Sequence, residues 1–253
     1  MHAMNTAPRA HDDWIDVPTT NVLTLAALAV AHTRYPWLDF RDPLAERVWQ
    51  SLGADASRLS DIELRAALGR SLLIDKYVHR WMQGRRDGRV VELGSGLSTR
   101  YARLPDLPRP LASIDEPSIA DVRREVFPKP RPFVQLSSPL EDRGWVRAVV
   151  AARATPFVVV EDAFLDVRRC DVLAILCSLA AELPSGSRLA ASFGPRTRFV
   201  VADGSARRAS LEVRVQHKHC PEEIVRFPRF AWVTPPSPLE GSSLPGVALL
   251  EVV

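Results

Sequence analysis

The chain has 253 residues, of which 46% are hydrophobic and 25% are charged, and its formal net charge is +3. This is the composition of an ordinary soluble globular protein, long enough to bury a sizeable core. The charge excess is small and its arginines are scattered among acids, so it gives no indication of a nucleic-acid-binding face.

The cysteines and the N-terminal residues indicate the cellular compartment in which the protein is expected. Cys170, Cys177 and Cys220 form neither a disulfide framework nor a metal-type pair, which fits a reducing compartment. The opening MHAMNTAPRAHDDWIDV carries acids where a signal peptide needs a basic and then an apolar stretch. The longest apolar run, 22–31, is too short to span a bilayer. We expect a soluble cytoplasmic protein with no metal and no membrane or nucleic-acid partner.

Residues 1–88 are predicted to form a helical cap. Helices are expected over 21–32, 43–52 and 60–83. The second follows Asp42-Pro43, a capping residue with proline in the first turn. The third opens with the capping-box pattern SDIE.

From residue 89 onward, strand-like runs alternate with helical segments, which predicts a parallel sheet with right-handed crossovers. The expected strands are 90–93, 111–114, 133–136, 156–160 and 188–193, and the expected helices are 98–104, 118–126, 141–153 and 166–183. Two later runs, 230–234 and 247–253, are separated by a Pro/Ser/Gly-rich loop, which suits an antiparallel pair at the sheet edge. We expect a single α/β domain over 1–253, with the cap at 1–88 and the sheet in 89–253.

A Gly-Ser-Gly turn follows the first strand directly in VVELGSGLSTR, residues 90–100. Ligands of doubly wound sheets bind outside the carboxyl ends of the strands. Gly94 permits a tight turn, and Gly96 lets a ligand approach the backbone. Asp115 ends the next strand with Glu116 beside it, where a carboxylate can accept hydrogen bonds from ribose hydroxyls. The alternative interpretation is a plain tight corner followed by a helix-capping acid.

The residues around the turn also bear on the cofactor. A dinucleotide site needs a third glycine for close packing of helix and strand, and Thr99 stands at that position. Glu92 lies two residues before the first glycine and would repel a pyrophosphate. S-adenosylmethionine carries a positive sulfonium and an amino acid moiety, and acidic residues near the turn suit these groups better than they suit a pyrophosphate. The turn therefore favours S-adenosylmethionine over NAD.

The stretch VVELGSGLSTRYARL resembles the glycine loop of the leucine carboxyl methyltransferase family, which includes polyketide O-methyltransferases of the tetracenomycin type. Other segments resemble that family in the same order, namely DFRDPLAERV, RSLLID, SIDEP, TPFVVVED and LPSGSRLAASF. The resemblance covers roughly residues 20–195. It implies a Rossmann-like class I methyltransferase sheet that binds S-adenosylmethionine.

The resemblance also implies roles for individual residues. Arg70 would pair with the cofactor's carboxylate through its planar guanidinium. Gly94 and Gly96 would line the methionine part, and Asp115 would hold the ribose. Glu161, at the end of the fourth strand, would lie near the transferred methyl and is the catalytic candidate. The full set of predicted cofactor-binding residues is Arg70, Glu92, Gly94, Ser95, Gly96, Asp115, Glu116, Ser138 and Glu161.

The chain departs from the family pattern at several positions. Ser98 replaces an aspartate of the glycine loop, and Ser137-Ser138 stands where an aspartate commonly reads the adenine. Asp162 replaces a glycine, and Asp166 falls where a tyrosine is usual. These differences concern the substrate and cofactor affinity rather than the fold.

The function favoured is O-methylation of a carboxylate or hydroxyl of a small molecule, with a polyketide-like metabolite as one candidate acceptor. A hydroxyl acceptor needs a base within hydrogen-bond reach, for which Glu161, Asp162, Asp166 and the histidines are candidates. The run 217–220, HKHC, is interpreted as surface, and His79 as an ordinary helix-face residue. The alternatives are a methyltransferase-like binding or scaffold protein without catalysis, and an NAD(P)-dependent oxidoreductase.

Overall fold

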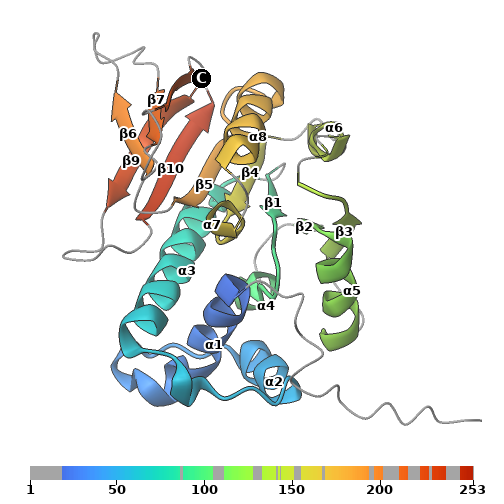
Figure 1. Cartoon of the computed structure of the whole chain (residues 1–253), viewed down its shortest axis with the longest axis vertical. Helices are drawn as coiled ribbons and strands as arrows, with labels where there is room; N and C mark the ends of the chain where they lie inside the picture. Colours follow the sequence, from blue (N-terminus) through green and yellow to red (C-terminus); the bar gives the residue numbers. More distant parts are fainter. Residues whose placement is uncertain are drawn as a thin grey trace, which may run out of the picture.

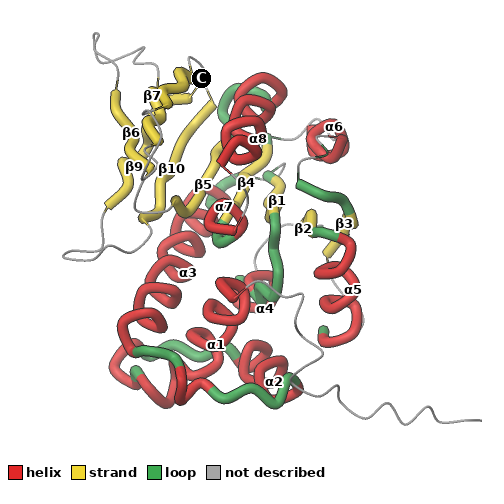
Figure 2. Tube along the Cα trace, in the orientation of Figure 1, coloured by secondary structure: helices red, strands yellow, loops and turns green. Residues whose placement is uncertain are grey.

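The computed structural model describes residues 19–85, 88–104, 111–127, 133–140, 142, 144–150, 155–166, 169–193, 197–201, 211–215, 223–227, 230–237 and 246–252. Figures 1 and 2 show a twisted sheet with helices on both sides and a group of N-terminal helices gathered at one end. Within the described ranges, no helix combines the length and the hydropathy needed to cross a membrane.

The N-terminal helices begin where the local signals predict. They are α1 (Thr19–Arg34), η2 (Pro36–Leu38), α2 (Pro43–Ser51), η3 (Ala56–Arg58) and α3 (Asp61–Met82). Asp42 caps α2 by accepting from Ala45 N at 2.9 Å. Ser60 and Glu63 form the predicted capping box of α3, each side chain accepting from the other residue's backbone N–H. The three expected helices are confirmed, with ends shifted by at most two residues.

The main sheet has seven strands in the order β3-β2-β1-β4-β5-β10-β9. Their bounds are β1 (Arg89–Leu93), β2 (Leu111–Asp115), β3 (Phe133–Ser137), β4 (Pro156–Val160), β5 (Arg188–Phe193), β9 (Phe230–Ser237) and β10 (Gly246–Val252). The first five pair in parallel, and β10 runs antiparallel to both β5 and β9. This confirms the expected fold class, a Rossmann-like, mostly parallel sheet with an antiparallel C-terminal pair and N-terminal helices.

The helices between the parallel strands are α4 (Arg100–Arg103), α5 (Pro117–Val126), α6 (Gly144–Val150), α7 (Ala163–Asp166) and α8 (Arg169–Glu182). Two expectations need correction. The helix expected from residue 98 starts at Arg100, because Ser98 N closes the glycine turn on Ser95 O at 2.9 Å. The single helix expected over 166–183 is two helices, and α7 begins directly after β4 with Leu165 N bonded to Asp162 O at 2.8 Å.

A second sheet of three antiparallel strands lies in a region for which no strand was predicted. It consists of β6 (Thr197–Val201), β7 (Leu211–Val215) and β8 (Glu223–Phe227) in the order β6-β7-β8. A signal was present in the sequence, because LEVRV alternates apolar and charged residues with the period of a half-exposed strand.

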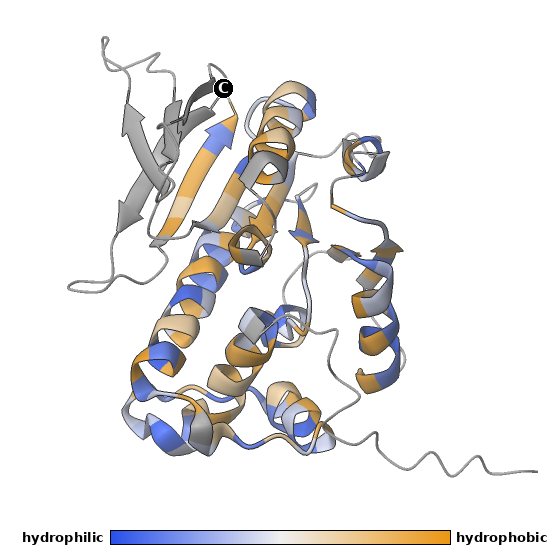
Figure 3. Ribbon diagram, viewed as in Figure 1, coloured by the Kyte–Doolittle hydropathy of each residue, from blue (hydrophilic) through white to orange (hydrophobic). Residues whose placement is uncertain are grey.

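Alternating strand residues divide the core between the two faces of the sheet. One face packs Val90, Phe157, Val159, Ala190 and Leu249 against α3. The other packs Val91, Val158, Val160, Leu189 and Leu250 against α6, α7 and α8. A third cluster joins α1, α2 and α3 to Leu97 and to α5. Figure 3 shows β10 as mostly apolar and α3 with polar and apolar turns alternating. The N-terminal helices thereby lie beside the end of the sheet where the glycine turn emerges.

Candidate functional site

The Gly-Ser-Gly turn and Asp115 form one hydrogen-bonded structure at the ends of β1 and β2. Gly94 and Gly96 have φ values of 59° and 52°, which glycine adopts without strain. Ser95 Oγ donates to Asp115 Oδ2 at 2.6 Å, and Gly96 N donates to Asp115 Oδ1 at 2.8 Å. The turn and the acid therefore lie together, as expected, and both carboxylate oxygens already bond the turn.

Side chains of the protein itself press against both glycines. A Cβ built on Gly94 would lie 2.4 Å from Ala163 Cβ, and one on Gly96 would lie 1.9 Å from Asn21 Oδ1. Asn21 belongs to α1, which thus covers the turn. The space at Gly96 that was expected to admit a ligand is taken by Asn21, because α1 packs directly on the backbone there.

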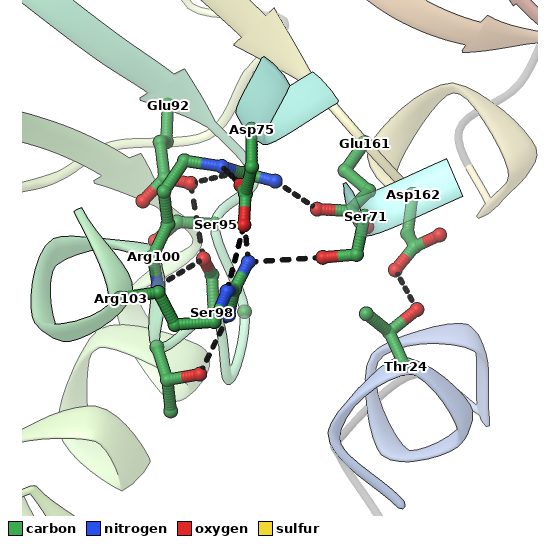
Figure 4. A network of polar contacts seen from close by, with 12 residues as sticks. Thr24, Ser71, Asp75, Glu92, Ser95, Ser98, Arg100, Arg103, Glu161 and Asp162 are labelled. Carbon is green, nitrogen blue, oxygen red and sulfur yellow. Dashed lines mark hydrogen bonds and ion pairs between the residues drawn. The ribbon is translucent and has the colours of Figure 1, made fainter. Parts of the chain in front are cut away.

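Arg100 is the centre of a buried network of charges (Figure 4). Its side chain is fully buried, and its Nε donates to Asp75 Oδ1 at 2.6 Å. Nη2 donates to Glu161 Oε2 at 2.6 Å, and Nη1 donates to Glu92 Oε1. Although burial lowers it, the pKa of Arg100 is raised well above its ordinary value by the carboxylates of Asp75, Glu161 and Glu92. One guanidinium thus joins α3, β1 and the end of β4 to α4.

Two more arginines extend this network. Arg103 bonds Asp75 Oδ2 at 2.8 Å and Asp42 Oδ2 at 3.2 Å, which joins α4 to α3 and to the cap of α2. Arg123, from α5, donates to the carbonyl oxygen of Gly96 at 2.5 Å. Arginine's several fixed donors suit such multiple bonding. Arg123 thus holds the backbone of the turn from α5, and Arg103 links α4, which follows the turn, to α3 and to the cap of α2.

Arg70 and Asp162 form a separate buried pair. Arg70 Nη2 donates to Asp162 Oδ1 at 3.1 Å, and each side chain is 4% exposed. Thr24 Oγ1 donates to Asp162 Oδ2 at 2.6 Å. One carboxylate after β4 therefore holds both α3, through Arg70, and α1, through Thr24. Arg70 Nε has no hydrogen-bond partner among the described residues, so part of its donor fork is unused.

A small cavity of about 10 Å³ lies beside the turn, enough for about one water molecule. Its walls come from α1, β1, the turn, α4 and β4: Asn21, Thr24, Glu92, Leu93, Gly94, Ser95, Leu97, Ser98, Arg100, Val159, Glu161 and Asp162. Two buried oxygens of these walls, Glu92 Oε2 and Glu161 Oε1, have no partner in the described part of the chain. Buried carboxylate oxygens of this kind are costly unless a donor or cation reaches them.

The buried charges around the turn are unbalanced. The described carboxylates are Asp42, Asp75, Glu92, Asp115, Glu161 and Asp162, and the described guanidiniums are Arg70, Arg100, Arg103 and Arg123. Six carboxylates against four guanidiniums leave an excess of two negative charges when all are ionised. Burial raises the pKa of Asp115, and burial together with the charge of Glu161 raises the pKa of Asp162 to about 6. Such an excess favours a cationic group in the cavity.

The cavity brings together four of the nine predicted cofactor residues: Glu92, Gly94, Ser95 and Glu161. Gly96 and Asp115 belong to the turn and its support. Arg70 does not line the cavity itself, but it bonds Asp162, which does. Glu116 and Ser138 do not line the cavity: Glu116 Oε1 accepts from Leu140 N at 3.3 Å, and Ser138 N donates to Asp115 O at 2.9 Å. The roles of all nine, and the catalytic role of Glu161, stay predictions.

The other candidates have simpler placements. His79 is exposed on α3 and contacts Gln83, its neighbour one turn on. The run 217–220 lies outside the described residues, as does the side chain of Asp166. In the described part of the chain, no cluster of three His, Cys, Asp or Glu is placed to hold a metal ion.

Sequence reasoning missed most of the residues that order this site: Asn21, Thr24, Asp75, Arg100, Arg103 and Arg123. A partial signal existed in α3, where Ser71 and Asp75 stand one helical turn apart among apolar residues and both are buried. A charged residue on an apolar helix face indicates a buried ion pair, because ionised groups are rarely buried alone. The pattern could not name the partner.

Comparisons with known proteins give distant structural similarity. No protein-family model and no curated protein matches the chain. The structure of SAM-bound CalS10, an amino pentose methyltransferase from Micromonospora echinaspora, is similar at 10% identity and TM-score 0.43, over 79% of this chain and 100% of that one. The CcbJ methyltransferase from Streptomyces caelestis is similar at 12% identity and TM-score 0.43, over 73% and 89%. The glycopeptide N-methyltransferase MtfA complexed with S-adenosyl-L-methionine is similar at 12% identity and TM-score 0.41, over 71% and 93%. Because these identities and TM-scores are low, the fold assignment rests on the order of the strands in the main sheet.

Proposed function

We propose that the chain is an S-adenosylmethionine-dependent methyltransferase that methylates a carboxylate or hydroxyl oxygen of a small molecule. The observation that carries this proposal is the glycine turn bonded to Asp115 beside a buried excess of carboxylates. In a doubly wound sheet this is the place where a ligand binds. Membership of the leucine carboxyl methyltransferase family, and a polyketide-like acceptor, are the finer parts of the same proposal.

The residues present fit the charges of this cofactor. Its sulfonium and ammonium are cationic, and Glu92 Oε2 and Glu161 Oε1 are buried acceptors that have no partner among the described residues. Its carboxylate can pair with Arg70, whose Nε also has no hydrogen-bond partner among the described residues. Asp115 already accepts one hydrogen bond at each oxygen, and each oxygen can accept another from a ribose hydroxyl. A pyrophosphate would meet repulsion from the same acids, which opposes a dinucleotide.

When bound, the cofactor supplies an electrophilic methyl group. The protein's contribution is alignment of the acceptor for an in-line displacement, which depends on rigid positioning. The network around Arg100 gives Glu92 and Glu161 that rigidity, because the guanidinium holds one oxygen of each. A carboxylate acceptor is already ionised and needs no base, whereas a hydroxyl acceptor would give its proton to Glu161 or Asp162.

Binding requires α1 to move. Pockets for ligands of this size are of order 300–1,000 Å³, far more than the cavity of about 10 Å³. Asn21 and Thr24 of α1 cover the turn and the cavity. Displacement of α1 would open both at once. The same closure also supports a second candidate, a methyltransferase-like binding or scaffold protein, as do the departures at Ser98 and Asp162.

Calorimetric titration with S-adenosylhomocysteine tests the proposal. We expect saturable binding to the full chain and loss of at least tenfold in affinity for Asp115→Asn, because this change removes a charged acceptor. Asp121→Asn, an exposed carboxylate of α5, is the matched control and should bind as the parent does. No binding at millimolar ligand would support the scaffold function. Binding of NADH instead would support an oxidoreductase.

The remaining expectations belong to the same proposal. The chain is taken as one methyltransferase domain over 1–253, with the cap at 1–88 and the sheet in 89–253. We place it in the cytoplasm, acting on a small molecule without nucleic-acid or membrane partners. Limited proteolysis tests the domain division, since one domain should give no stable fragment that ends near residue 88.

A further inference from the structure

Asp162 is a buried carboxylate that pairs with Arg70, the residue predicted to bind the cofactor's carboxylate. Its Oδ1 accepts from Arg70 Nη2 at 3.1 Å through a single hydrogen bond. Carboxylates frequently engage arginine through two parallel bonds, and here Arg70 Nε is left without a partner among the described residues. The pair is therefore incomplete, although both side chains are 4% exposed.

The second oxygen of Asp162 holds the helix that covers the turn. Thr24 Oγ1 donates to Oδ2 at 2.6 Å, and Thr24 lies one helical turn from Asn21 on α1. Asn21 fills the space at Gly96, and both residues line the cavity. A change at Asp162 therefore affects the guanidinium and the covering helix together.

We propose that Asp162 occupies Arg70 in place of a ligand carboxylate, so that the site selects ligands carrying a carboxylate and takes up a proton when they displace it. Asp162 is thus a specificity-determining residue of the proposed methyltransferase site, and the inference rests on that function. The ligand class is an amino acid conjugated to a nucleoside, in which the carboxylate competes for Arg70.

The proton follows from the charges that face Asp162. They are Arg70 from α3 and Glu161 from the end of β4, with the neutral Thr24 from α1. Once a ligand carboxylate pairs with Arg70, Asp162 loses its only cationic partner among these groups and has a second carboxylate competing for the same guanidinium. Burial and the charge of Glu161 already raise its pKa to about 6, and the loss of Arg70 raises it further. Asp162 then takes one proton from solvent, which forms an O–H bond on its carboxylate, and no other covalent bond forms or breaks.

The experiment is calorimetric titration of the full chain with S-adenosylhomocysteine at pH 6, 7 and 8, in pairs of buffers with different ionisation enthalpies. We expect uptake of about one proton per site at pH 7 and 8 and of about half a proton at pH 6, where Asp162 is already about half protonated. The affinity should rise by up to tenfold for each pH unit lowered from 8 toward 6. 5′-Methylthioadenosine has no carboxylate, so its binding should take up no proton and depend little on pH.

The matched variants are Asp162→Asn and Asp121→Asn. The amide introduced by Asp162→Asn cannot carry the charge, so this variant should bind up to about a hundredfold more tightly than the parent at pH 8, with no proton uptake and a flat pH profile. Asp121→Asn should keep the parental profile. If Asp162→Asn fails to fold, proton uptake by the parent protein in the paired buffers still tests the proposal.

The outcomes separate the two proposals. Binding of S-adenosylhomocysteine by the parent with no proton uptake and equal affinity at pH 6 and 8 would overturn this inference and leave the methyltransferase function standing. Retention of the parental pH dependence in Asp162→Asn would also overturn it. Absence of binding in every protein would overturn the proposed function and the inference together.

Discussion

Two buried arginines near the glycine turn differ in how completely they are paired. Arg100 uses Nε, Nη1 and Nη2 on three carboxylates from three different elements. Arg70 makes a single hydrogen bond to one carboxylate and leaves Nε without a partner in the described part of the chain. Both side chains are almost fully buried, so exposure to solvent does not account for the difference.

This difference in pairing indicates that Arg100 is a structural charge, whereas the partner of Arg70 can be exchanged. Removing Arg100 would leave Asp75, Glu92 and Glu161 without their common cation, so the fold depends on it. Arg70 faces one carboxylate whose pKa of about 6 allows it to be neutralised near physiological pH. We therefore expect Arg100 to contribute more to stability than Arg70, whose carboxylate partner can be neutralised, and four experiments test that difference.

The largest expected effect is on Arg100. Arg100→Met should lower the free energy of unfolding by about 4 kcal/mol, because breaking a buried ion pair leaves uncompensated charges. Urea denaturation followed by circular dichroism measures this. Arg65→Met is the control: Arg65 is 61% exposed and pairs with Asp61 on the surface, so its loss should stay within about 0.5 kcal/mol. Equal losses for the two variants would contradict the structural role of the buried Arg100.

The next effect is the pH dependence that Asp162 confers on stability. Its pKa is raised in the folded protein, to about 6 from an ordinary value of 3.8, so the fold binds this proton more tightly than the unfolded chain does. The contribution is therefore favourable below about pH 4 and is lost as pH rises through 6. The loss is about 2 to 3 kcal/mol. Unfolding of the parent and of Asp162→Asn across pH 4–7 measures it, and parallel curves for the two proteins would contradict it.

Arg70→Met should lower the free energy of unfolding by about 2 kcal/mol at pH 7, less than Arg100→Met, because Asp162 can take up a proton once its partner is gone. The double variant Arg70→Met, Asp162→Leu should recover most of this loss, since no buried charge is then left unpaired. Chemical denaturation of the two single variants and the double variant gives the coupling energy. A coupling near zero would mean that the two side chains do not interact.

The smallest effect is on Thr24. Thr24→Val keeps the shape of the side chain and removes the hydrogen bond to Asp162, which should lower the free energy of unfolding by about 1 kcal/mol. Because α1 then loses one attachment over the cavity, S-adenosylhomocysteine should bind faster. Stopped-flow association rates test this. Thr33→Val is the control, since the Thr33 hydroxyl donates to Val30 O in its own helix.

The elements that local patterns define were predicted well. The caps at Asp42 and Ser60 place the starts of α2 and α3, because capping bonds span only three residues. The five parallel strands follow from short apolar runs separated by helices. The strands β6–β8 were not predicted, because they contain no long apolar run, although LEVRV in β7 alternates apolar and charged residues as strands do.

The site was predicted only in its outline. The joining of Asp115 to the turn follows from sheet topology, since the ends of neighbouring parallel strands meet at one edge. The partners of Arg100 lie 25, 8 and 61 residues away along the chain, and no spacing rule relates them. Nor does any pattern indicate that Asn21 would fill the space at Gly96 or that Thr24 would bond Asp162.

By itself, the sequence determined where the three N-terminal helices and the five parallel strands lie, where the glycine turn falls, and that acids surround it. These properties depend on bonds and side-chain periodicity within a few residues. Only the tertiary structure decided which carboxylate neutralises which guanidinium, which oxygens are left over, and how little room the cavity has. Such outcomes depend on distances through space between segments far apart in the chain, and electrostatic and packing forces act on those distances alone.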